Sequence, residues 1–106
     1  MFSKLVCTAM LLGIVNTNAE ENVTLTMGRF VYFNELATQN FTIKNNTAQT
    51  IKRVHVNCGF FSQDQLIGIG IGIVVNLPPN AEGYNDANLS TDIRPDNARC
   101  RVDSIE

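Results

Sequence analysis

The chain has 106 residues, a length typical of a single domain, and a formal net charge of −2 at pH 7. This mildly acidic balance excludes a nucleic-acid partner or an anionic membrane surface, because both attract basic proteins. After the N-terminal apolar run there is no second hydrophobic span, so we expect no membrane span in the mature chain.

The N-terminal segment has the three parts of a secretory signal peptide. A short cationic start precedes the apolar run 5–15, and a polar stretch ends at Ala19 with the small residues that signal peptidase requires. The apolar run has 11 residues, whereas a transmembrane helix needs about 20. Cys7 lies near the start of this run and is therefore not the site of a lipid anchor. We predict that residues 1–19 are removed and that residues 20–106 form a periplasmic or secreted β-sandwich domain.

Removal of that segment leaves two cysteines, Cys58 and Cys100. In an oxidising compartment such a pair predicts one disulfide with a single possible connectivity. A metal site is the alternative, but His55 is the only histidine and no CxxC spacing occurs. On the chain-entropy model a disulfide closing this loop contributes about 4 kcal/mol, a large contribution for so small a domain.

Apolar and polar residues alternate through the first half of the mature chain, which predicts strands. The alternation over Val23 to Met27 resumes at Phe30 to Phe33, so we expect an extended segment with a bulge or bend at Gly28. A second strand is expected around Phe41 to Ile43, and it ends at the polar cluster 45–47.

The third expected strand has the clearest alternation. One of its faces is apolar and includes Cys58, and the other is polar. A hairpin connection is expected at 62–65. The residues of the apolar face are Val54, Val56, Cys58 and Phe60, and those of the polar face are Arg53, His55 and Asn57.

The fourth expected strand, Leu66 to Asn76, alternates isoleucine with glycine and stops at two prolines. A phosphate-binding glycine loop needs a helix directly after the glycines, and no helix pattern follows here. We expect a strand whose glycine face is closely covered by a neighbour or left flat. The alternative is that this bare face admits an added strand or a partner.

The stretch 81–97 is polar and is expected to be mostly loop, with room for a short strand near Tyr84 or Leu89. The last strand is expected at Ala98 to Ile105, with Cys100 on its apolar face. Because both cysteines face the core, a bridge between them is sterically natural.

The candidate catalytic and metal-binding residues lack the partner residues that such sites require. His55 could act as a general base, but no Ser or Cys nucleophile lies close to it along the chain, and both mature cysteines are expected in the disulfide. We therefore predict no enzyme and no cofactor. The spacing of the acidic residues does not match a calcium loop, so no metal site is predicted; these residues are Asp86, Asp92, Asp96 and Asp103.

Four Asn-x-Ser/Thr triplets occur, and in a eukaryotic secreted protein they would be glycan acceptors. An Asn- and Thr-rich β protein also generates such triplets by composition alone. The four asparagines are Asn22, Asn40, Asn45 and Asn88.

The polar faces of the third and last strands each carry two basic side chains. If Cys58 and Cys100 bring these strands side by side, the cations form a basic stripe that attracts an acidic partner. The alternative is a solvated outer face with Asp103 as a counter-charge. The predicted partner-binding residues are Arg53, His55, Arg99 and Arg101.

Two stretches of the chain carry a family resemblance: FTIKNNTAQTIKRVHVNCGFF and, after the polar hairpin, LIGIGIGIVVNLPPNAE. With them the region from about Phe41 to Glu82 resembles the FxLYD-like and related immunoglobulin-like extracytoplasmic domains of bacteria. The chain departs from that pattern by lacking a Leu-Tyr-Asp triplet after Phe60 and a glycine after Pro79. The resemblance implies a small sandwich with an interaction role and no active-site residues.

Together these observations predict an all-β, small immunoglobulin-like β-sandwich of five to seven strands with one disulfide. The predicted function is an exported, non-enzymatic protein-interaction domain, such as an accessory component of an envelope assembly. The alternative is an inhibitor or immunity protein that blocks an exported enzyme or toxin with the segment Pro79 to Asp96. In either case the expected partner is another exported or envelope protein.

Overall fold

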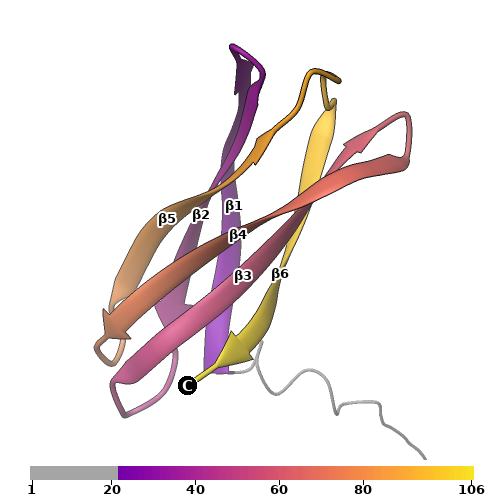
Figure 1. Ribbon diagram of the computed structural model, residues 1–106. Helices are drawn as coiled ribbons and strands as arrows, with labels where there is room; N and C mark the ends of the chain where they lie inside the picture. The colour runs from indigo at the N-terminus through magenta and orange to yellow at the C-terminus, as the bar shows by residue number, and fades with distance from the viewer. Residues whose placement is uncertain (1–21) are drawn as a thin grey trace, which may run out of the picture.

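The computed structural model describes residues 22–106, so the expected signal peptide lies outside the described residues. Six antiparallel strands form two three-stranded sheets (Figure 1), in the orders β1-β2-β5 and β4-β3-β6. The predicted all-β sandwich is confirmed, and its arrangement is consistent with an immunoglobulin-like fold. The strands are β1 (Val23–Phe33), β2 (Leu36–Asn45), β3 (Ile51–Ser62), β4 (Gln65–Leu77), β5 (Glu82–Ser90) and β6 (Asn97–Ile105).

The core lies between the central strands of the two sheets. The predicted apolar face of β3 is fully buried against Phe41 and Ile43 of β2, which are themselves 0% exposed. Alternation places these side chains on one face of each strand, and the two faces meet between the layers. No helix among residues 22–106 is long and apolar enough to cross a membrane.

The predicted irregularity at Gly28 is confirmed. The register of β1 against β2 shifts between Met27 and Phe30. The buried Gln39 side chain fills the gap, and its Nε2 donates hydrogen bonds to the carbonyls of Gly28 (3.1 Å) and Asn40 (2.9 Å). A bulge leaves ladder groups unpaired, and here a neighbouring side chain satisfies them.

The predicted hairpin at 62–65 is also confirmed. Gln63 and Asp64 both have positive φ, 51° and 65°, as a two-residue turn of type I′ requires. Asn34 and Glu35 connect β1 to β2 in the same way, with φ of 52° and 62°.

The glycine face of β4 is covered, as the first interpretation expected. A Cβ on Gly70 would lie 2.5 Å from the Asn88 carbonyl oxygen, and one on Gly72 would lie 2.5 Å from the Phe41 ring. Strand β5 therefore approaches β4 as closely as glycine permits, and no room remains on this face for an added strand. The isoleucines of β4 consequently point away from the core.

The strand allowed near Tyr84 or Leu89 exists but is longer than expected, because β5 occupies Glu82–Ser90 within the stretch 81–97 that was expected to be mostly loop. It pairs with β2 without interruption, from Leu36 opposite Ser90 to Lys44 opposite Glu82. The polar sequence of β5 does not indicate a strand. Pairing with β2 and close packing on the β4 glycines stabilise β5, and local propensity does not report such tertiary contacts.

The predicted disulfide joins β3 to β6 as directly opposite residues. Cys58 pairs with Cys100 in the ladder, and their Cα atoms are 4.0 Å apart. Cys58 is fully buried. The bridge therefore fixes the register of β6, which is an edge strand held by β3 alone within the second sheet.

Candidate binding surfaces of the second sheet

The outer face of the β4-β3-β6 sheet, hereafter the outer face, consists of three columns of side chains. Its β4 column is aliphatic and will be called the aliphatic column. In the register, Ile69 lies beside Gly59, Ile71 beside Asn57, and Ile73 beside His55. The aliphatic column comprises Leu66, Ile69, Ile71, Ile73 and Val75.

The aliphatic column is the main apolar feature of the described surface. Its members are between 39% and 61% exposed, and they make up five of the eleven exposed large hydrophobic residues within 22–106. Monomeric proteins rarely leave contiguous apolar patches uncovered, and such patches mark contact surfaces. Sequence reasoning missed this column. The strict Gly-Ile alternation would have indicated it, but only with the knowledge that the glycines face inward.

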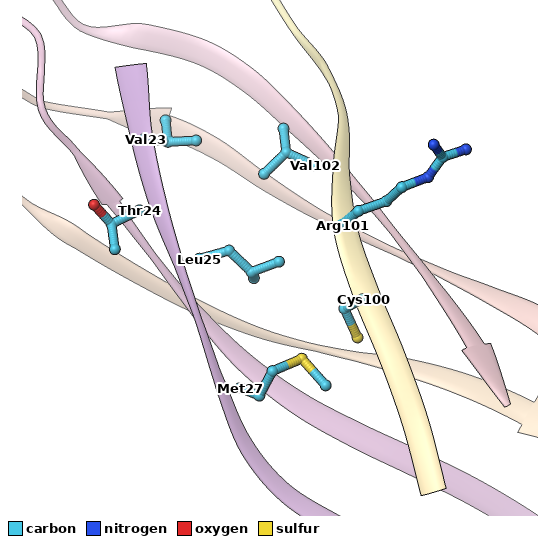
Figure 2. Close-up of a pocket in the computed structure, with 7 residues that line it drawn as sticks. All are labelled: Val23, Thr24, Leu25, Met27, Cys100, Arg101 and Val102. Atoms are coloured by element: carbon cyan, nitrogen blue, oxygen red, sulfur yellow. The ribbon is translucent and has the colours of Figure 1, made fainter. Parts of the chain in front are cut away.

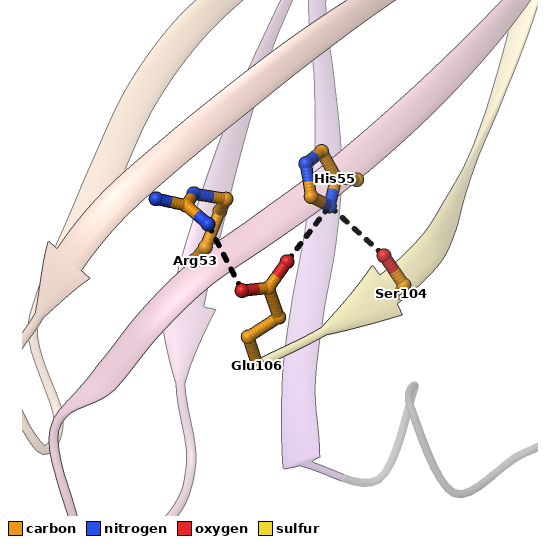
Figure 3. Close-up of polar contacts among 4 residues, drawn as sticks. All are labelled: Arg53, His55, Ser104 and Glu106. Atoms are coloured by element: carbon orange, nitrogen blue, oxygen red, sulfur yellow. Dashed lines mark hydrogen bonds and ion pairs between the residues drawn. The ribbon is translucent and has the colours of Figure 1, made fainter.

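The four predicted partner-binding residues lie on the outer face, two of them on β3 and two on β6. Arg99 and Arg101 lie beside Gly59 and Asn57 of β3. Arg53 and His55 lie farther along the same face of β3, beside Ser104 and Glu106 near the C-terminus (Figure 3).

Two of the cations are neutralised by neighbouring carboxylates. Arg53 Nη1 donates to Glu106 Oε1 at 2.9 Å, and Arg99 Nη2 donates to Asp64 Oδ1 at 3.2 Å. The Arg99 guanidinium also stacks on the Phe61 ring, 4.1 Å from its centroid. Arg101 makes no ion pair with any residue in the described part of the chain. Among the three arginines predicted to bind a partner, it is therefore the one that remains open to an external carboxylate.

Strict alternation fails near the end of β6, which corrects the expected position of Asp103. A register shift between His55 and Val56 brings Ser104, and not Asp103, opposite His55. A bulge inserts one residue and reverses the parity that follows it. Ile105 then faces Val54 of the core.

This bulge assembles a Ser-His-Glu cluster, which sequence reasoning missed (Figure 3). Ser104 Oγ is hydrogen-bonded to His55 Nδ1 at 2.9 Å, and Glu106 Oε2 lies 4.0 Å from the same nitrogen. A catalytic triad needs the acid on one ring nitrogen and the nucleophile on the other, so that the acid orients the base. Here both partners approach Nδ1, and Glu106 is also engaged by Arg53. The cluster has the geometry of a surface hydrogen-bond network and not of a triad.

Two hollows adjoin β6. One lies on the outer face above Gly59, has a volume of about 290 Å³, and is lined by Phe61, Leu66 and Ile69 with Arg99 and Arg101 at its rim. The glycine keeps it open, because a Cβ at position 59 would lie 3.1 Å from Phe61 Cε2. An apolar group carrying a negative charge matches this lining.

The other hollow is a cleft of about 360 Å³ between the edges of β1 and β6. Figure 2 shows Leu25 and Met27 of β1 facing Cys100 of β6, while the Arg101 side chain points away from the cleft. The sandwich is therefore open along this side.

The remaining candidates do not form sites. Among residues 22–106 no three potential metal ligands converge, and this includes the four aspartates considered for calcium. Of the glycan acceptors, Asn22 and Asn88 are exposed and Asn40 is partly buried, whereas Asn45 is completely buried. The folded domain thus excludes a glycan on Asn45.

No family model matches the chain, and no curated protein or solved structure matches it either. The class of protein defined here is therefore a structural one: a small disulfide-linked β-sandwich with an exposed aliphatic column on one sheet.

Proposed function

We propose that this chain is an exported, non-enzymatic protein-interaction domain that binds another exported or envelope protein through the outer face. One observation carries the proposal, namely the aliphatic column of β4. Contact of five large aliphatic side chains with water is unfavourable, and covering them with a partner would lower the free energy. The neighbouring cations of β3 and β6 give the surface a polar, charged margin, which is typical of protein interfaces.

Export is supported by the disulfide and by the N-terminal sequence. A cross-strand disulfide in a small all-β domain is compatible with an oxidising compartment. The predicted signal peptide over 1–19 supplies the route. Mass spectrometry of the protein from its native host should find a mature chain that begins at Glu20. Intact Met1 at steady state in the cytoplasm would contradict export.

The resemblance to FxLYD-like domains supports an interaction role but assigns no partner. The inhibitor alternative relied on a loop from Pro79 to Asp96, and half of that segment is strand β5. The outer face is therefore the better candidate for the binding surface.

The test is a pull-down from the native envelope followed by affinity measurement with matched variants. Ile69→Thr/Ile71→Thr keeps β-branched side chains in the strand but removes the apolar surface. We expect it to weaken binding of the captured partner at least about tenfold. The control Val31→Thr/Leu36→Thr changes exposed aliphatic residues of the other sheet and should leave affinity unchanged. Undiminished binding by the Ile69→Thr/Ile71→Thr protein, with its melting temperature preserved, would reject the outer face.

A further inference from the structure

The two long sides of the sandwich differ. On one side β4 and β5 are in close contact, and Asn85 Nδ2 of β5 donates to the Ile73 carbonyl of β4 at 2.6 Å. On the other side lies the cleft between β1 and β6. Within the described residues β1 pairs only with β2, and β6 pairs only with β3. Two free strand edges (Figure 1) thus border one apolar cleft (Figure 2).

The backbone of β6 shows which of its polar groups face the free edge. Opposite residues of an antiparallel pair lie about 4.5 Å apart when they share no hydrogen bonds, and about 5.5 Å apart when they do. The Cα separation of Cys58 and Cys100, 4.0 Å, identifies a pair without mutual hydrogen bonds. The N–H and C=O of Cys100 therefore point away from β3. By alternation the same holds for Ala98 and Val102.

The charges on β6 indicate which strand would fit. Arg99 and Arg101 alternate with these free-edge residues and project onto the outer face. Arg101 has no carboxylate partner among residues 22–106, and the partner of Arg99, the Asp64 side chain, is 91% exposed. Side chains of an added strand would lie about 5 Å from these arginines, close enough for opposite charges to pair.

We propose that β6 accepts an added β-strand from a partner protein, and that in this strand large apolar side chains alternate with acidic ones. The apolar side chains fill the cleft beside Leu25, and the acidic side chains pair with Arg99 and Arg101. The backbone of the added strand completes hydrogen bonds with Ala98, Cys100 and Val102, as in strand addition to other sheet edges.

Charge also decides against a second copy of this chain as the occupant. Antiparallel pairing of β6 with β6 about Cys100 would place Arg99 of one copy opposite Arg101 of the other. Like charges directly opposite one another destabilise a strand pair. The proposal concerns the edge of the second sheet and does not depend on binding at the aliphatic column.

The experiment uses short acetylated peptides and the oxidised mature protein. The first peptide alternates glutamate with isoleucine, the second has lysine in place of glutamate, and the third is the glutamate peptide with N-methylated backbone amides. Amide hydrogen exchange and chemical-shift titration by NMR report the site and the dissociation constant.

We expect the glutamate peptide to slow exchange at the amides of Ala98, Cys100 and Val102. It should bind at least about fivefold more tightly than the lysine peptide, in keeping with a strand-pair charge contact of about 1 kcal/mol. Arg99→Gln/Arg101→Gln should abolish this preference. The N-methylated peptide should not bind, because it cannot pair with a strand edge.

Three outcomes would overturn the proposal. These are unchanged exchange at the three β6 amides, equal binding of the glutamate and lysine peptides, and equal binding of the N-methylated peptide. Self-association through β6, seen by sedimentation and by protection of the same amides without peptide, would identify a second copy as the occupant and also overturn it.

Discussion

Asn45 is a fully buried polar side chain that connects three segments of the chain. Its Nδ2 donates to the carbonyls of Gln49 (2.8 Å) and Leu77 (2.9 Å), and its Oδ1 accepts from the Thr47 amide at 2.8 Å. Buried polar groups are tolerated when they are fully hydrogen-bonded. This side chain therefore holds the β2–β3 turn against the end of β4.

Substitution Asn45→Asp should destabilise the domain by about 3 kcal/mol, because two donors are lost and a carboxylate faces two carbonyl oxygens. Urea denaturation of the purified variant measures this change. The control Asn46→Asp alters an exposed neighbour and should cost less than about 1 kcal/mol. Equal effects of the two substitutions would show that the Asn45 network is not important for stability.

At the scale of the element, β4 is a strand whose small residues face the core and whose large residues face solvent. Alternation identifies two faces but does not say which is buried. The contact with β5 decides it, because only glycine allows the Asn88 backbone to approach so closely.

Substitution Gly70→Ala should lower the free energy of unfolding by about 3 kcal/mol, the upper range for overpacking, because the added methyl meets backbone that cannot move aside. Gly59→Ala on the same sheet is the matched control. Its methyl would meet only the side chains of Phe61 and Leu66, so a loss below about 1 kcal/mol is expected. Thermal melts followed by circular dichroism would compare the two. Equal melting temperatures of the two variants would contradict the close β4–β5 contact.

At the scale of the whole molecule, the disulfide attaches the edge strand β6 covalently to β3. Without the bridge, only pairing with β3 would hold β6 in its sheet. Cys58 contributes to the core and Cys100 to the cleft. Loss of the bridge should therefore destabilise the protein in two ways. It loosens β6 in the folded state, and it increases the conformational entropy of the unfolded state.

Reduction of Cys58–Cys100 should lower stability by about 2–5 kcal/mol. Guanidinium denaturation of the oxidised and the reduced protein provides the measurement. Reductant should leave the denaturation midpoint of the double variant Cys58→Ala/Cys100→Ala unchanged, which controls for effects of the reductant itself. An identical midpoint for oxidised and reduced wild-type protein would contradict a structural role.

The charges of the whole molecule should act mainly on the rate of association. Arg101→Glu should slow binding of the captured partner about tenfold at low salt and weaken the salt dependence of the rate. Lys44→Glu makes the same change in net charge on β2 of the other sheet and should have little effect. Stopped-flow measurements over a series of salt concentrations distinguish the two. Equal slowing by both variants would indicate that only net charge matters.

Sequence by itself determined the strand periodicity, the bulge at Gly28, the hairpin at Gln63-Asp64 and the pairing of the two cysteines. Each of these depends on local alternation, on turn chemistry or on counting, which neighbouring residues specify. Only the tertiary structure decided which face of β4 is exposed, that polar residues 82–90 form a strand, and that Ser104 lies beside His55. Those features arise from contacts between segments distant in the chain, and a single bulge in β6 was enough to change which side chains meet.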